Sequence, residues 1–200
     1  MNVFKKLFKQ TFIYGLATVL PRALAIFLVP LYVLVLGKEQ FGVYASLMAF
    51  LILGNVLLSY GMETAFFRFI NKEDYKKEKI QSTALTSITV STLIFLVLTL
   101  SIKTEIATFL NFKVEFITYG LLILALDALV VIPFVWLRTN EKSSRYAIIK
   151  IVNVCINLSF NLFLFLVLPL WAKDSNNSFW DAINLEEGKV AYVFISNLIA

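Results

Sequence analysis

The sequence contains no histidine and a single cysteine, Cys155. Without histidine it can build neither a Ser-His-Asp triad nor a histidine metal site, and one cysteine cannot form an internal disulfide or a thiolate cluster. The seven glycines are scattered and form no phosphate-binding loop. We therefore expect no metal, no cofactor and no enzymatic activity.

Charge is also scarce, at 16% of residues, while 60% are hydrophobic and the mean hydropathy is +0.82. An average soluble domain is roughly 45–50% apolar. A chain of 200 residues cannot hide so much apolar surface in one core, so many side chains must face lipid. The composition predicts a membrane protein.

Long apolar runs between charges predict an all-α, polytopic membrane helix bundle. The runs cover residues 11–36, 40–62, 80–102, 116–137, 151–172 and 190–200. The first five exceed the roughly 17 residues that a spanning helix needs. The sixth is only eleven residues long, so we expect the sequence to be truncated inside helix six, as the N-terminal part of a longer protein.

Lysine and arginine are distributed unevenly between the two sides of this topology. With a cytoplasmic N-terminus, the inner segments hold twelve of the 18 basic residues and the outer loops hold five. Basic residues favour the cytoplasmic side. We expect the N-terminus inside, and the net charge of +5 to meet anionic membrane lipids rather than nucleic acid.

Two charges fall near the middle of predicted spans, where a lone charge costs about 2.5–3.5 kcal/mol. Arg22 follows Pro21, and Pro30 lies eight residues later, so we expect a kinked helix whose freed carbonyls line a cavity. Thr18 shares the face of Arg22. Arg22 could face a substrate, or it could pair with Asp127 in the fourth span.

Asp127 is the only carboxylate at the middle of a predicted span. If it does not pair with Arg22, it could carry a coupling proton. Glu63 lies where the second span ends, and we expect it to be solvated or paired with Arg68.

Asn153, Asn157 and Asn161 recur every four residues in the fifth span and form one amide stripe. Amides in hydrocarbon need hydrogen-bond partners. These partners could be neighbouring helices or the hydroxyl groups of a sugar.

Three stretches carry a resemblance to a known family. They are LVPLYVLVLGKEQFGVY at 28–44, SYGMETAFFRFI at 59–70, and WLRTNEKSSRYAIIKIVNVCINLSFN at 136–161. Together they resemble the N-terminal half of bacterial polysaccharide exporters, the oligosaccharide flippases of the multidrug/oligosaccharidyl-lipid/polysaccharide superfamily.

The resemblance implies twelve to fourteen helices in two six-helix lobes around a cavity that opens alternately to either side. This chain would be the first lobe, in the bacterial inner membrane. Its substrate would be a polyprenyl-pyrophosphate-linked oligosaccharide, with a proton or sodium ion as a possible coupling cation. In related lipid II flippases a helix-one arginine binds pyrophosphate, and Arg22 is the matching position. Those flippases carry an acid beside that arginine, whereas Ala23 follows Arg22 here, so a surface or capsular glycan carrier fits better.

Two rival functions stay open. A cation-coupled multidrug antiporter of the same superfamily should favour a cavity acid over a cavity arginine. A membrane-embedded glycosyl or acyl transferase would need paired carboxylates or a histidine. Glu73 and Asp74 are the one adjacent acidic pair in the expected cytoplasmic segments, and lysines surround them.

Overall fold

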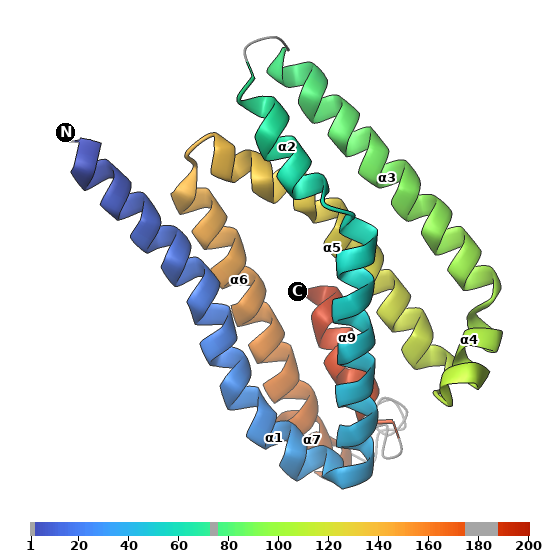
Figure 1. The fold of residues 1–200 in the computed structure, drawn as a ribbon. Coiled ribbons are helices and arrows are strands. Elements are labelled where there is room, and N and C mark those ends of the chain that lie inside the picture. The colour runs from blue at the N-terminus through green and yellow to red at the C-terminus, as the bar shows by residue number, and fades with distance from the viewer. Residues whose placement is uncertain (1–2, 73–75, 175–187) are drawn as a thin grey trace.

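The computed structural model describes residues 3–72, 76–174 and 188–200. Helices make up nearly all of these residues, and no strand occurs among them. The helices are α1 (Val3–Ser59), α2 (Met62–Ile70), α3 (Lys77–Ser101), α4 (Lys103–Leu110), α5 (Val114–Thr139), α6 (Ser143–Leu162), the π-helix η1 (Phe163–Val167), α7 (Leu168–Asp174) and α9 (Val190–Ile199). The predicted all-α helix bundle is confirmed (Figure 1).

Helix α1 doubles back on itself. If straight, its 57 residues would extend about 86 Å, nearly three times the hydrocarbon thickness of a bilayer. The reversal occurs at Gly37, which has φ of 70° and ψ of 177°. Steric clashes with a Cβ atom make this backbone conformation accessible almost exclusively to glycine. The backbone is helical through Pro21 and Pro30, so the break lies at Gly37 rather than at either proline.

Four helical stretches are long and apolar enough to cross a membrane, and the first of them contains both arms of α1. The second is α3, the third is α5, and the fourth runs from α6 through η1 into α7. Large apolar side chains point outward along these helices, including Leu34 (83% exposed) and Leu57 (78%). Outward apolar surface of this kind suits a bilayer and not water.

The helix boundaries differ from the predicted ones at several places, and α1 and α6 each begin eight residues before their apolar runs. The second apolar run breaks after Ser59 and resumes as α2, and the third run is followed by the short helix α4. Left-handed backbone, which hydropathy does not report, occurs between α1 and α2 and at the end of α4. Tyr60 and Gly61 have φ of 33° and 71°, and Asn111, with φ of 57°, ends α4.

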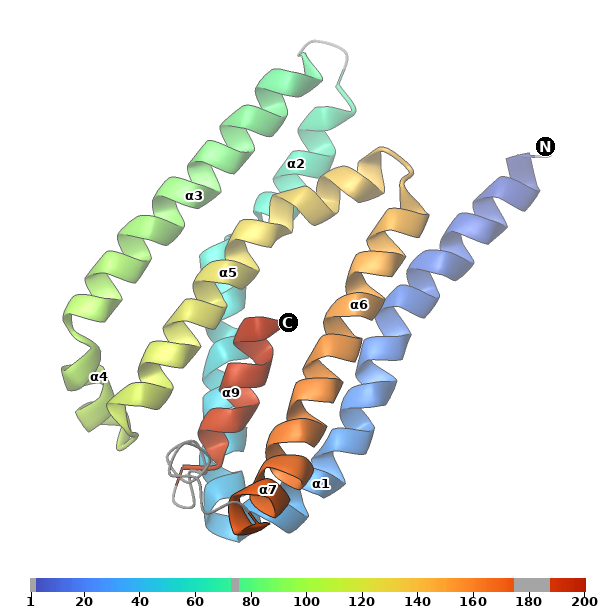
Figure 2. The same ribbon diagram turned by 180° about the vertical axis from the view of Figure 1, so that it is seen from behind.

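The bundle has two unlike ends. The end that contains Gly37 and the start of α9 is called the Gly37 end, and the opposite end, with α2, is called the α2 end. Helix α9 lies among α1, α5 and α6 and stops about halfway along the bundle (Figures 1 and 2). Its residues Val190 to Phe194 are almost completely buried and form the centre of the largest apolar cluster.

Candidate functional site

A cavity of about 340 Å³ lies at the α2 end of the bundle. Its walls are Asn55, Glu63, Asp127, Val130, Val131, Phe134, Val135, Arg138, Tyr146 and Lys150. Two acids, two bases and an amide therefore gather at one hollow in a chain that has few charges. We call this hollow the polar cavity.

Helix periodicity places the cavity residues of α5 and α6. Asp127, Phe134 and Arg138 are separated by seven and four residues, so they share one face of α5. Tyr146 and Lys150 are one turn apart on α6. The two helices thus present polar side chains to the same space.

Helix α2 supplies the remaining acid of the cavity. The left-handed backbone at Tyr60 and Gly61 ends α1 and starts α2 in a new direction. Figure 1 shows this break, with α2 passing beside α3. Glu63, in the first turn of α2, thereby lines the cavity.

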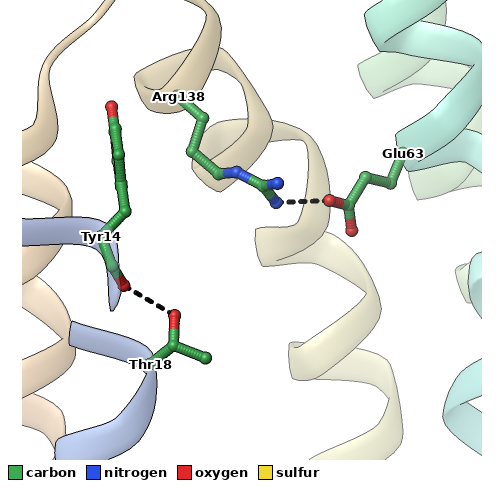
Figure 3. Close-up of polar contacts among 4 residues, drawn as sticks. All are labelled: Tyr14, Thr18, Glu63 and Arg138. Carbon is green, nitrogen blue, oxygen red and sulfur yellow. Dashed lines mark hydrogen bonds and ion pairs between the residues drawn. The ribbon is translucent and has the colours of Figure 1, made fainter. Parts of the chain in front are cut away.

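Glu63 accepts a hydrogen bond in an ion pair with Arg138, which reaches across from α5 (Figure 3). The Arg138 guanidinium also lies 5.0 Å from the ring centroid of Phe67 on α2. Of the two expected states of Glu63, pairing with Arg68 does not occur, because five residues along α2 place Arg68 on another, exposed face, while the Glu63 side chain stays about half exposed. The pair links α2 to α5 at the cavity wall.

Asp127 is hydrogen-bonded to one other cavity residue. Its Oδ2 accepts a hydrogen bond of 3.0 Å from Asn55 Nδ2. Lys150 lines the same cavity from α6. Asp127 thereby joins the α1 and α5 walls of the polar cavity.

An aromatic row borders the basic residues of the cavity. The rings of Tyr14 and Tyr146 lie edge to face at 5.4 Å, as do those of Tyr146 and Phe134. Lys150 Nζ is 4.3 Å from the Phe134 centroid. The Tyr14 hydroxyl is buried and has no hydrogen-bond partner among the described residues.

The two predicted site residues on α1 lie outside the lining of the polar cavity. Thr18 donates a hydrogen bond of 2.8 Å to the Tyr14 carbonyl, one turn earlier (Figure 3). Arg22 is exposed and, within the described part of the chain, forms no ion pair. The suggested pair of Arg22 with Asp127 is absent from this conformation, since Asp127 instead contacts Asn55.

The three asparagines of α6 make hydrogen bonds, most of them to other helices. Asn153 donates to the Ala200 backbone oxygen (2.7 Å) and Asn157 donates to Asn197 Oδ1 (3.0 Å). Asn161, which is completely buried, accepts from the Tyr32 hydroxyl (2.8 Å) and donates to Asn157 within α6. The stripe therefore ties α6 to α1 and α9 here, and contact with sugar hydroxyls stays a prediction.

Residues 7–183 match the family described as polysaccharide biosynthesis protein. The chain belongs to this family. Its members are generally transporters or flippases rather than enzymes, and the apolar helices agree with a membrane protein. No curated protein and no solved structure matches the chain.

In this member of the polysaccharide biosynthesis family, the polar cavity brings together residues that the sequence did not single out. Arg138 and Lys150 flank apolar runs, where basic residues ordinarily meet water or lipid headgroups, and Asn55 is an uncharged residue inside the run 40–62. The signal available in the sequence was spacing, because Arg138 shares a helix face with Asp127. The Glu73–Asp74 pair lies outside the described residues.

Proposed function

We propose that this chain forms one lobe of a flippase that moves a polyprenyl-pyrophosphate-linked oligosaccharide from the inner to the outer leaflet of a bacterial inner membrane. The observation that carries the proposal is the polar cavity inside an apolar bundle of the polysaccharide biosynthesis family. A glycan headgroup needs a path shielded from hydrocarbon, while its polyprenyl tail can stay in lipid.

The chemistry of the cavity suits a glycan. Sugar hydroxyls both donate and accept, and carboxylate, amide and guanidinium groups supply the matching partners. The rings of Phe134 and Tyr146 add flat apolar walls. The 340 Å³ volume is at the lower end of the range for small-molecule sites, which fits one or two sugar units in one lobe of a larger pathway.

Arg22 is our candidate for the pyrophosphate, because guanidinium binds phosphate oxygens in a bidentate manner. Its exposed side chain is available to a ligand, and Thr18 precedes it by one turn. Asn153 and Asn157 could exchange their present hydrogen bonds for sugar hydroxyls when α6 and α9 move apart. Rocking of two lobes would alternate access to the cargo.

Asp127 is our candidate for coupling to a proton or sodium ion. It is a carboxylate at mid-span, and the positive charge of Lys150, which lines the same cavity, would balance the bare carboxylate when a cation leaves. With the N-terminus cytoplasmic, the polar cavity would face the cytoplasm, where the loaded lipid is made.

A strain that lacks the gene tests the function directly. We expect lipid-linked oligosaccharide to accumulate in a form protected from a membrane-impermeant glycan-modifying enzyme. The full-length protein should restore exposure, and Arg22→Ala should not, at equal protein levels. Normal exposure of the glycolipid in the deletion strain would refute the flippase.

One observation favours a second candidate, the cation-coupled multidrug antiporter. A cationic drug needs a cavity acid, and Asp127 and Glu63 both line the polar cavity. Two basic residues offset them, which makes the cavity better suited to a neutral glycan than to a cation. New sensitivity to cationic drugs in the deletion strain, with normal glycolipid exposure, would favour the antiporter.

A further inference from the structure

A second hollow, of about 560 Å³, runs between α2 and α3. It is lined by Met62, Ala65, Phe66, Phe69, Lys79, Ile80, Thr83, Ala84 and Ser87, and it shares none of these residues with the polar cavity. Lys79 is its one charged residue. We call it the α2–α3 groove.

The groove follows from which faces the two helices present. Met62, Ala65 and Phe69 recur at spacings of three and four on α2, and Ile80, Thr83 and Ser87 do the same on α3. The facing small side chains leave room where larger ones would fill the gap. The walls are therefore apolar and continuous.

The groove has a floor and a charged rim. At the floor, the Tyr60 hydroxyl lies 3.1 Å from Ser87 Oγ and bridges the break between α1 and α2 to α3. Lys79 stands at the rim, in the first turn of α3, and Ser87 lies eight positions further along the same helix. This spacing gives a depth of about 12 Å.

The rim belongs to a segment that is rich in basic residues. Between residues 68 and 79 there are five basic residues, Arg68, Lys72, Lys76, Lys77 and Lys79, and three acidic ones, Glu73, Asp74 and Glu78. The side chains of all five basic residues are exposed. A basic rim above an apolar slot is complementary to an anionic headgroup above an acyl chain.

We propose that the α2–α3 groove is a binding site for an anionic phospholipid, with one acyl chain between α2 and α3 and the phosphate at Lys79. The proposal does not depend on the transported cargo. Such a lipid would fill the space beside α2 and hold that helix against α3 and α5.

The occupant is a phospholipid of the surrounding membrane rather than the tail of a cargo in the polar cavity. A packed cluster that includes Phe66, Ile88, Ile132 and Val135 lies between α2, α3 and α5, and these four side chains are at most 2% exposed. A tail would have to cross this cluster to reach the groove from the cavity. The membrane itself supplies phospholipid to the groove without that obstacle.

The test uses the full-length protein in nanodiscs of equal phosphatidylglycerol and phosphatidylcholine, with retained lipid counted by native mass spectrometry. We expect phosphatidylglycerol to be retained preferentially. Lys79→Gln should weaken its retention about fivefold, the effect of one interfacial lysine on an anionic lipid. Lys77→Gln removes the same charge two residues away, outside the groove lining, and should change retention less than twofold.

A second pair of variants tests the slot itself. Ala65→Phe fills the groove and should abolish preferential retention, whereas Thr64→Phe places the same aromatic side chain at an exposed neighbour outside the groove lining and should not. If Ala65→Phe fails to fold, the comparison of Lys79→Gln with Lys77→Gln decides whether the groove binds the lipid. Equal retention of both phospholipids, equal effects of the two lysine variants, or full replacement of phosphatidylglycerol by an equal amount of polyprenyl phosphate would each overturn the proposal. This experiment does not measure glycolipid export, so a result that overturns the lipid site has no bearing on the proposed flippase function.

Discussion

The same helices form a tightly packed apolar core at one end of the bundle and a polar cavity at the other. At the Gly37 end, α9 fits among α1, α5 and α6, and its residues Val190 to Phe194 are at most 2% exposed. At the α2 end, α1, α2, α5 and α6 instead surround a polar cavity. Helices α1, α5 and α6 thus pass from a dry, packed environment to a polar one along their length.

We infer from this difference that packing at the Gly37 end contributes most to stability, while the polar residues at the α2 end contribute more to transport than to stability. Close packing depends on complementary shapes, so few substitutions are tolerated. A half-exposed ion pair such as Glu63 with Arg138 contributes about 0–1 kcal/mol to stability. We expect changes at the Gly37 end to unfold the protein, and changes at the α2 end to alter transport while the fold persists.

The largest effect should come from the centre of the packed end. Phe194 is completely buried, so Phe194→Ala should lower the free energy of unfolding by about 3–5 kcal/mol through lost contacts and a cavity. Unfolding of the full-length protein in mixed detergent micelles would measure this. Phe109→Ala, at a side chain that is 88% exposed, is the matched control and should cost less than about 1 kcal/mol. Equal losses would contradict a localised packed end.

The next largest effect should come from the reversal of α1. Gly37→Ala places a Cβ at φ 70° and ψ 177° and should destabilise the fold by about 1–3 kcal/mol. Gly42→Ala, five residues later, is the control, because this glycine is helical and a Cβ there meets nothing within 4 Å. Alanine at residue 42 should stabilise the protein by about 0.5–1 kcal/mol. Opposite signs at these two glycines are the expected result in an unfolding titration.

A smaller effect should come from the hydrogen bond between Tyr32 and Asn161, near the packed end. A double-mutant cycle of Tyr32→Phe and Asn161→Ala should give a coupling energy of about 0.6–1.7 kcal/mol, as for other interhelical hydrogen bonds in membranes. The same cycle on Asn157 and Asn197, where Asn197 is exposed, should give less. A larger coupling at the exposed pair would contradict the ranking.

The sequence predicted the spans because a helix that crosses a bilayer must be apolar and about 20 residues long, and both properties can be read from the sequence. The apolar runs 80–102 and 116–137 correspond to α3 and α5 within a few residues at each end. The turn at Gly37 also followed from the polar break after residue 36. What hydropathy could not give is backbone geometry, such as the left-handed angles at Tyr60 and Gly61 that separate α2 from α1.

The candidate site was harder to predict, because a cavity depends on which helices are neighbours. Asp127 was identified by its depth in an apolar run, but its hydrogen-bond partner Asn55 and its cavity neighbour Lys150 come from other helices. The spacing of residues in one sequence shows which residues share a face of a helix, but it does not show which residues of different helices contact each other. The amide stripe on α6 was predictable as a stripe, and its partners in this structure depend on where α1 and α9 lie.

The smallest effect on stability should accompany a clear effect on transport, at the ion pair of Glu63 and Arg138. Arg138→Glu places two carboxylates together across the polar cavity, which should push α2 away from α5 and reduce export of the glycolipid severalfold. Stability should fall by less than about 1 kcal/mol, because both side chains are about half exposed. The exchanged pair, Glu63→Arg with Arg138→Glu, restores the attraction and should return export to within about twofold of the natural protein. Protection of lipid-linked glycan from an impermeant enzyme reports export, and an unfolding titration reports stability. If Arg138→Glu instead lowers the free energy of unfolding by more than about 3 kcal/mol, the α2 end is as tightly packed as the Gly37 end. The proposed difference between the two ends would then be wrong.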